Sequence, residues 1–208
     1  MSLFIKICGI TSVKDASLAV SFGANALGFN MYEKSPRYVS HQEVKEILKE
    51  VPNEIIPVMV FVDSCYEYVK DCLKLSTNII PQFHGNETPE FCSSFNRNFI
   101  KAIPVSKKSD INNGFKRYTG SWMILLDSYS QKEFGGSGKK FDWTYLKDKD
   151  YDKPYLVAGG LNPNNVAEVL SLTSCTGLDV SSGVESSPGK KDSMKIKEFI
   201  DVARNFHV

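Results

Sequence analysis

A cysteine and an aspartate each stand at the end of a short strand-like run. Cys8 follows the run 4–7, and Asp127 follows the apolar run 122–126. If both runs are strands of one parallel barrel, both side chains lie at its C-terminal mouth, where such enzymes work. A base and an acid at one pocket are the minimum apparatus for moving a proton on a small carbonyl-type substrate.

The two residues differ in how strongly position alone indicates chemistry. A buried cysteine is more often a small hydrophobe than a catalyst, so Cys8 needs its strand-end position and the following Gly9 to stand out. An acidic side chain is costly inside an apolar core and natural at a wet mouth. Asp127 is therefore the stronger candidate of the two.

Glycine- and serine-bearing turns follow two later strand-like runs. Gly159 and Gly160 come after the run 155–158, and Ser181, Ser182 and Gly183 come after the run 177–180. Barrels commonly build a phosphate site from the amides of these loops and a short helix N-terminus. The pattern predicts a phosphorylated ligand.

A third turn, with Gly136 at its centre, spans residues 134–139 after the run that ends at Asp127. We expect this segment to cover the mouth as a loop and to help bind the phosphate. Glycine suits such loops because a bare backbone approaches a ligand closely.

Three further side chains lie near these strand ends. Lys6 is two residues before Cys8 and so points to the same side of its strand, where it sets the charge near the thiol or makes an interior salt bridge. Arg37 follows the second strand-like run, and its planar fork suits a carboxylate or a phosphate. His84 ends the fourth run, a position that favours the mouth. His41 and His207 are interpreted as surface residues.

Eight short apolar segments recur along the chain, and several are continuously apolar, as strands covered on both faces are. The predicted strands are 3–8, 26–30, 55–62, 79–83, 99–105, 122–127, 155–158 and 177–180.

Amphipathic stretches with helix-start signals separate these segments. Capping-box spacing is predicted at Ser40 with Glu43 and at Ser64 with Glu67, and a capping residue precedes proline at Thr88 and Asn162. Pro52 is expected to end the helix that begins after Ser40. Two helices are poorly supported, one over 106–116 and a short one after Phe141.

The alternation of strands and helices eight times predicts an α/β fold, a (β/α)₈ barrel of eight parallel strands. An open doubly wound sheet is the alternative, but no Gly-x-Gly-x-x-Gly turn follows the first strand. No linker or low-complexity tract marks a boundary, so we expect one domain over residues 1–208.

The bulk composition bounds the class of function. The chain has 208 residues, 42% hydrophobic and 24% charged, with a net charge of +1, so nothing favours nucleic acid or an anionic membrane as partner. Five cysteines, no signal-like start and no bilayer-length run lead us to expect a cytoplasmic protein with reduced thiols. No His, Cys, Asp and Glu cluster has metal-ligand spacing, so no metal is expected.

An ordered set of motifs from residue 3 to about residue 192 resembles phosphoribosylanthranilate isomerase, an enzyme family of tryptophan biosynthesis. Each motif is weak alone, and the ordered set is specific. The motifs lie at 6–11, 28–29, 34–39, 60–62, 82–85, 126–128, 135–138, 141–143, 158–161 and 177–185.

The resemblance implies a (β/α)₈ barrel that isomerises N-(5-phosphoribosyl)anthranilate to the corresponding aminodeoxyribulose phosphate without metal or cofactor. It implies that Cys8 is the general base, that Asp127 is the general acid and that Arg37 holds the anthranilate carboxylate.

The same resemblance assigns substrate binding to a further set of residues, which are His84, Gly136, Gly159, Gly160, Ser181, Ser182 and Gly183. A bound phosphate is expected against the amides of Gly160, Ser182 and Gly183. We also expect positive potential near Cys8, from Lys6, to lower the pKa of the thiol.

This chain departs from the family pattern at Phe83 and Asn86, where leucine and aspartate are usual, and more freely over 30–33. Two alternatives stay open: another phosphosugar isomerase on the same barrel, and a barrel that binds a phosphorylated metabolite without turning it over. The expected partner is a phosphorylated small molecule, with no nucleic acid or membrane, and the chain is expected to be a monomer or a homodimer.

Overall fold

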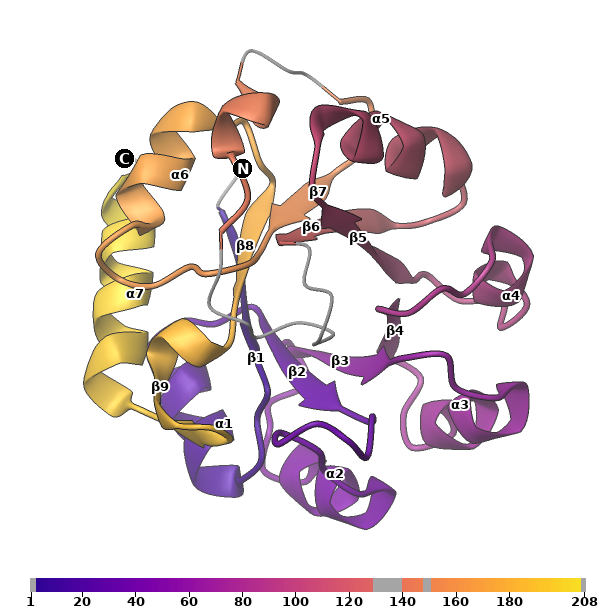
Figure 1. The fold of residues 1–208 in the computed structure, drawn as a ribbon. Coiled ribbons are helices and arrows are strands. Elements are labelled where there is room, and N and C mark those ends of the chain that lie inside the picture. Colours follow the sequence, from indigo (N-terminus) through magenta and orange to yellow (C-terminus); the bar gives the residue numbers. More distant parts are fainter. Residues whose placement is uncertain (1–2, 129–139, 148–150, 207–208) are drawn as a thin grey trace.

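The computed structural model describes residues 3–128, 140–147 and 151–206. Eight parallel strands close into a barrel in sequence order, and the last strand pairs with the first (Figure 1). The predicted barrel is confirmed and the open doubly wound sheet is wrong. The strands are β1 (Phe4–Cys8), β2 (Ala26–Asn30), β3 (Ile56–Phe61), β4 (Ile80–Phe83), β5 (Ile100–Val105), β6 (Met123–Ser128), β7 (Tyr155–Val157) and β8 (Gly177–Val180).

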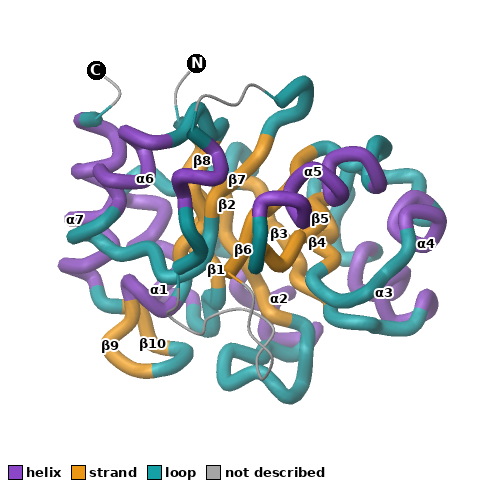
Figure 2. Tube along the Cα trace, turned by 45° about the horizontal axis from the view of Figure 1, so that its top comes forward, coloured by secondary structure: helices purple, strands orange, loops and turns teal. Residues whose placement is uncertain are grey.

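Helices surround the barrel on its outside (Figure 2). They are α1 (Val13–Ser21), α2 (His41–Leu48), α3 (Tyr66–Leu73), α4 (Pro89–Ser93), α5 (Lys108–Arg117), α6 (Val166–Leu172), α7 (Ser193–Asn205) and the 3₁₀ turns η1 (Trp143–Leu146) and η2 (Ser182–Val184). Two predicted helix starts are confirmed. The Ser40 side chain and Glu43 form a reciprocal capping box, and the Thr88 side chain accepts from the Phe91 backbone N–H ahead of α4.

Three predicted helix boundaries are wrong. α3 is capped at Cys65 without any side-chain hydrogen bond, so Ser64 and Glu67 form no capping box. α6 begins only after Asn165, because Asn162 instead accepts from the Asn164 backbone N–H within a turn. α2 ends at Leu48, four residues before Pro52.

The helix predicted with poor support over 106–116 forms as α5. Its first turn is stabilised by Asp110, whose carboxylate accepts hydrogen bonds of 3.0 Å from the backbone N–H groups of Ser106 and Lys107. A carboxylate at this end of a helix satisfies donors that have no partner inside the helix. The stretch after Phe141 forms the single turn η1.

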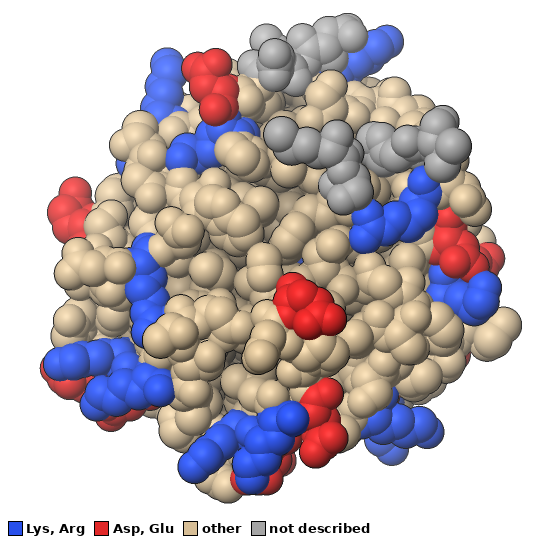
Figure 3. All heavy atoms as spheres, turned by 180° about the vertical axis from the view of Figure 1, so that it is seen from behind, with Lys and Arg blue, Asp and Glu red and all other residues tan. Residues whose placement is uncertain are grey.

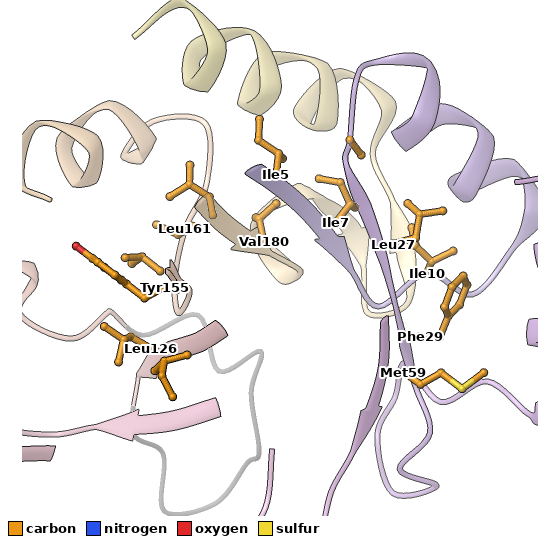
Figure 4. Packing of buried hydrophobic residues seen from close by; sticks show 14 of the residues in the cluster. Ile5, Ile7, Ile10, Leu27, Phe29, Met59, Leu126, Tyr155, Leu161 and Val180 are labelled. Carbon is orange, nitrogen blue, oxygen red and sulfur yellow. The ribbon is translucent and has the colours of Figure 1, made fainter. Parts of the chain in front are cut away.

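The main hydrophobic core lies between the strands and the helices. Figure 4 shows part of it, with Ile5 and Ile7 of β1 and Val180 of β8 pointing away from the barrel axis toward the helices. Fully buried side chains of this kind dominate the stability of α/β domains.

A second, smaller apolar cluster fills the barrel itself and sets the position of the polar side chains above it. Met123 and Leu125 of β6 belong to this cluster, and Asp127 follows on the same side of the strand. In the same way Ile80 of β4 packs against the cluster and Gln82 follows it. The interior is therefore apolar at the N-terminal ends of the strands and polar at their C-terminal ends.

A short antiparallel hairpin, not predicted from the sequence, follows β8. It consists of β9 (Glu185–Ser187) and β10 (Lys190–Lys191), and it lies beside α1 (Figure 2). The Lys191 backbone N–H donates to the Asp15 carboxylate of α1 at 3.2 Å. The hairpin brings Glu185 back to the barrel mouth.

The surface is mixed in charge. On the face opposite to that of Figure 1, lysine and arginine are interspersed with aspartate and glutamate around the periphery (Figure 3). None of the helices in the described part of the chain has the length and apolar character needed to cross a bilayer.

A buried ion pair between Lys101 and Glu87 holds the turn after β4 in place. The Lys101 ammonium of β5, 2% exposed, donates to the Glu87 carboxylate at 2.9 Å and to the carbonyl oxygens of Phe83 and Gly85 at 3.2 and 2.6 Å. Glu87 also accepts from the backbone N–H groups of Asp63 and Gly85. This pair therefore fixes the backbone on both sides of His84.

Replacing Lys101 with methionine is expected to lower the free energy of unfolding by about 3–5 kcal/mol, because it leaves the Glu87 carboxylate buried without its cation. Urea denaturation measures this loss. Lys74→Met, which removes an exposed lysine paired with Asp71, is the matched control and should leave stability nearly unchanged. A loss for Lys101→Met no larger than that of the control contradicts the role given to the pair.

Candidate active site

A cavity of about 440 Å³ opens at the C-terminal ends of the strands. Eight of the ten candidate residues line it, from the ends of six different strands: Cys8, Arg37, His84, Asp127, Gly159, Gly160, Ser181 and Ser182. Gly183 lies in η2 and is not part of the lining. Gly136 lies outside the described residues. The thiol and the carboxyl group singled out from the sequence thus share one chamber.

Cys8 lies against a strand position where only glycine fits. In the pairing of β1 with β2, Cys8 stands opposite Gly28. A Cβ atom at Gly28 would lie 2.6 Å from Cys8 Sγ, 2.9 Å from Cys8 Cα and 3.0 Å from Lys6 Nζ. The missing side chain of Gly28 therefore makes the space that the thiol and the ammonium group share.

Lys6 enters the barrel interior and is fully buried there. Its Nζ donates to the Asp179 carboxylate of β8 at 2.8 Å. Burial alone lowers the pKa of Lys6, but the charge of Asp179 and the neighbouring Cys8 outweigh it and raise the pKa above its ordinary value. Lys6 is therefore a fixed cation beside the thiol.

The expected lowering of the Cys8 pKa is wrong. Burial raises the pKa of the thiol above its ordinary value, and the Asp179 carboxylate acts in the same direction. Lys6 opposes both effects, as expected from its charge, but does not overcome them. The thiolate is a minority form at neutral pH and a correspondingly strong base.

Asp127 is buried in β6 with both carboxylate oxygens in hydrogen bonds. Oδ1 accepts from the Ser128 backbone N–H at 2.8 Å, and Oδ2 lies 3.1 Å from His84 Nε2. Gly159 makes room on the other side: its φ is +83°, and a Cβ there would lie 2.8 Å from Asp127 Oδ1. One of the predicted phosphate-loop glycines thus also shapes the pocket of the carboxyl group.

His84 links Asp127 to a buried amide. The Gln82 side-chain N–H donates to His84 Nδ1 at 3.0 Å, so Nδ1 acts as acceptor. His84 then carries its proton on Nε2 and donates it to Asp127. The prediction that His84 faces the mouth is confirmed, and its contact is the Asp127 carboxylate.

Arg37 is held by a carboxylate from the hairpin after β8. Its Nε donates to Glu185 Oε1 at 2.9 Å and its Nη2 donates to Oε2 at 2.7 Å, a bidentate pair. Lys191 Nζ donates to Glu185 Oε1 at 2.8 Å. Burial alone raises the pKa of Glu185, but the two cations outweigh it and hold the pKa below its ordinary value. The guanidinium fork is thereby fixed at the cavity wall.

The loops after β7 and β8 meet at the same wall. The Gly160 carbonyl oxygen accepts from the Asn165 amide at 2.9 Å, which orients that turn. Ser181 Oγ is buried, and within the described chain it has no hydrogen-bond partner. An unpartnered buried hydroxyl at a cavity wall is available to a ligand. A phosphate at this wall stays a prediction.

Sequence reasoning missed three residues that hold the site together. Asp179, like Asp127, is an acidic residue in an otherwise apolar strand, and the sequence alone is enough to identify it as a candidate on that ground. Gln82 and Glu185 lie within the motifs at 82–85 and 177–185, but their contacts with His84 and Arg37 form only when the barrel closes.

The arrangement combines a thiol, a carboxyl group and fixed cations in a chamber of small-molecule size, which is suited to proton transfer on an anionic substrate. Within residues 3–128, 140–147 and 151–206, no group of three or more His, Cys, Asp or Glu side chains is placed to hold a metal ion. That the reaction needs no metal or cofactor stays a prediction.

Comparisons with known proteins agree on one family. The sequence model described as N-(5'phosphoribosyl)anthranilate (PRA) isomerase matches residues 5–202. The N-(5'-phosphoribosyl)anthranilate isomerase of Neisseria meningitidis is 42% identical over 198 residues, 95% of each chain. That of Geotalea uraniireducens is 43% identical over 201 residues, covering 96% of this chain and 98% of its own.

Solved structures extend the agreement to three dimensions. The phosphoribosylanthranilate isomerase of Thermotoga maritima superimposes with a TM-score of 0.90 at 36% identity, covering 98% of this chain and 99% of its own. A phosphoribosyl anthranilate isomerase in complex with reduced 1-(o-carboxyphenylamino)-1-deoxyribulose 5-phosphate gives a TM-score of 0.85 at 35% identity, covering 98% of this chain and 99% of its own. By sequence and by fold, this chain belongs to the N-(5'-phosphoribosyl)anthranilate isomerase family.

Proposed function

We propose that this chain isomerises N-(5-phosphoribosyl)anthranilate to 1-(2-carboxyphenylamino)-1-deoxyribulose 5-phosphate, with Cys8 as general base and Asp127 as general acid. The observation that carries the assignment of roles is that both side chains line one cavity of about 440 Å³. The curated relatives and the matching family bear the name of this activity. The reaction is an Amadori rearrangement within the pathway to tryptophan.

Asp127 acts first in the proposed sequence. In its protonated form it gives a proton to the furanose ring oxygen, the C–O bond of the ring breaks, and the nitrogen lone pair forms a Schiff base with the first sugar carbon. The Asp127 carboxylate that remains is stabilised by hydrogen bonds from the Ser128 backbone and from His84.

Cys8 acts second. Its thiolate removes the proton from the second sugar carbon, and the electron pair moves to neutralise the Schiff base and give an enolamine. The enolamine tautomerises to the ketone. Before this transfer, the Lys6 ammonium stabilises the Cys8 thiolate across the space left by Gly28.

Two anchors orient the substrate in this proposal. Arg37, fixed by Glu185, binds the anthranilate carboxylate, and the turns containing Gly160 and Ser182 bind the phosphate. Ser181 Oγ, buried and unpartnered in the described region, is available to add a hydrogen bond. A solved relative holds a reduced product analogue whose name includes both a carboxyphenyl group and a phosphate.

The assembly proposed for this chain is a monomer or a homodimer. Solved structures of the Thermotoga maritima relative include monomers generated from a dimeric enzyme. Sedimentation equilibrium distinguishes the two states for this chain.

Cys8→Ser and Asp127→Asn are each expected to lower kcat by about 10²–10⁴-fold, because each removes one proton-transfer group and little volume. The change in fluorescence as the anthranilate-linked substrate is consumed measures turnover. Calorimetric titration with the reduced product analogue measures binding and should give nearly wild-type affinity. If both variants turn over normally, the assignment of roles is wrong. If the wild-type protein binds the analogue but does not convert substrate, the chain is a binding protein instead.

In the pH profile of kcat/KM, the midpoint of the acid limb is expected above the ordinary pKa of a cysteine thiol, ~8.5. Burial raises the pKa of Cys8, and only the deprotonated thiol is a base. Activity therefore rises with pH through that limb. Iodoacetamide labelling of Cys8 over a pH series, followed by peptide mass spectrometry, measures the same ionisation, and exposed Cys65 controls for decay of the reagent. A midpoint at or below the ordinary thiol range refutes this expectation. Lys6→Gln should move the midpoint further upward.

Gly28→Ala is expected to lower kcat/KM by on the order of 10²-fold, because the added methyl group occupies the space of Cys8 Sγ and pushes on its backbone. Steady-state kinetics measure the loss. Gly120→Ala, where the new methyl group meets only Ser93 Oγ at 3.4 Å, is the matched control and should keep wild-type rates. Equal rates for the two variants contradict the requirement for glycine beside the thiol.

A further inference from the structure

A fully buried amide lies behind the imidazole that contacts Asp127. Gln82 belongs to β4 and His84 follows two residues later, so both side chains point to the same side of the strand and line the cavity. The Gln82 N–H donates to His84 Nδ1 at 3.0 Å. The other end of the amide, Oε1, is buried and has no hydrogen-bond partner in the described part of the chain.

The amide determines which ring nitrogen of His84 carries the proton. An amide N–H facing Nδ1 requires an unprotonated Nδ1, and the proton then resides on Nε2. In that state His84 donates to Asp127 Oδ2 at 3.1 Å and Asp127 is a carboxylate, without the proton that an acid must give.

A half turn of the amide reverses this hydrogen-bond pattern. Oε1 then accepts a hydrogen bond from a protonated Nδ1, and Nε2 becomes an acceptor toward a protonated Asp127 Oδ2. This second arrangement holds one more proton than the first, shared between Nε2 and the carboxyl oxygen. Because Oε1 has no hydrogen-bond partner among the described residues, no hydrogen bond at that end of the amide holds it in the observed orientation.

We propose that Gln82 is a positioning residue whose amide turns with the protonation of the His84–Asp127 pair, so that one orientation holds the proton on Asp127 and the other stabilises the carboxylate. When Asp127 gives its proton to the ring oxygen, Nδ1 releases its proton to solvent, Nε2 takes up a proton from solvent, and the amide turns back. One proton taken from solvent restores the acid form. This inference rests on the proposed role of Asp127 as acid.

The charged surroundings are common to both orientations. The other titratable groups that line the same cavity are Cys8, Tyr32, Lys34, Arg37 and Asp179. Behind the β4 turn, Lys101 and Glu87 hold the carbonyl and N–H of Gly85. None of these groups is a described hydrogen-bond partner of the Gln82 amide, so a substitution at Gln82 changes the imidazole directly.

Ring-nitrogen NMR of His84 tests the inference on the wild-type protein. Only three histidines are present, and His84→Asn identifies the signals of this one. The expected result at high pH is a proton on Nε2 alone, and on lowering the pH Nδ1 gains a proton while Nε2 and Asp127 share the other. An Nδ1 that is protonated at all pH values, or that never gains a proton while the fold persists, overturns the proposal.

Two variants separate the amide from its surroundings. Gln82→Met keeps the approximate volume and removes both hydrogen-bonding ends, so the two neutral tautomers of His84 should become mixed. Gln82→Glu offers only acceptors, so Nδ1 should stay protonated. For Gln82→Met, kcat/KM should fall on the order of 10-fold, which is less than the ~10²–10⁴-fold loss expected when a general acid itself is removed. The pH profile should be displaced, and KM should be nearly unchanged.

Gln42→Met, an exposed glutamine of α2, is the matched control and should change none of these readouts. A His84 tautomer that is unaffected by Gln82→Met overturns the proposal whatever the activity. A changed tautomer with wild-type kcat/KM and pH profile overturns its catalytic part. Normal turnover in Asp127→Asn would instead overturn the proposed function, while the NMR result on Gln82 would stand.

Discussion

The ion pair between Lys6 and Asp179 joins the first strand of the barrel to the last and lies directly beside the thiol of the active site. The two residues stand opposite each other in the pairing of β1 with β8, and their side chains meet at 2.8 Å inside the closed barrel. A buried ammonium is tolerated only with such a partner, because desolvation of an isolated charge costs several kcal/mol. The closure that makes the barrel is therefore also what places a cation beside Cys8.

The two groups proposed to transfer protons have opposite kinds of surroundings. Cys8 lies beside a fixed cation in a space left by Gly28, and Asp127 lies beside the His84 imidazole in a space left by Gly159. A cation supports the anionic form of the thiol. An imidazole that donates or accepts can support either form of a carboxyl group. The difference matches a base that must become an anion and an acid that must gain and lose a proton in each cycle.

The order of the strands and the residues at their ends are predictable from sequence because apolar runs report burial directly. All eight predicted strands occur within two residues of their expected bounds, and Cys8, His84 and Asp127 share the cavity expected for them. Local capping is less predictable. Ser40 and Thr88 cap helices, whereas Ser64 and Asn162 do not, since a capping residue competes with other turn geometries that the surrounding chain decides.

Contacts between distant strands set what the sequence did not predict. Lys6 and Asp179 are 173 residues apart, and Arg37 and Glu185 are 148 residues apart. The balance of burial against charge at Cys8 follows from such contacts, and for that reason the direction of its pKa shift was predicted wrongly. Residue type indicates which interactions are available, and only the closed barrel determines which one is stronger.

The hydrogen isotope effect on turnover of substrate carrying deuterium at its second sugar carbon tests the roles of Cys8 and Asp127 most directly. If Cys8 removes that proton, Cys8→Ser makes this step limiting and shows a large primary isotope effect. If Asp127 opens the ring, Asp127→Asn makes the earlier step limiting and shows nearly none. The reverse pattern, or the same isotope effect in both variants, would contradict the assignment of the thiol as base and the carboxyl group as acid.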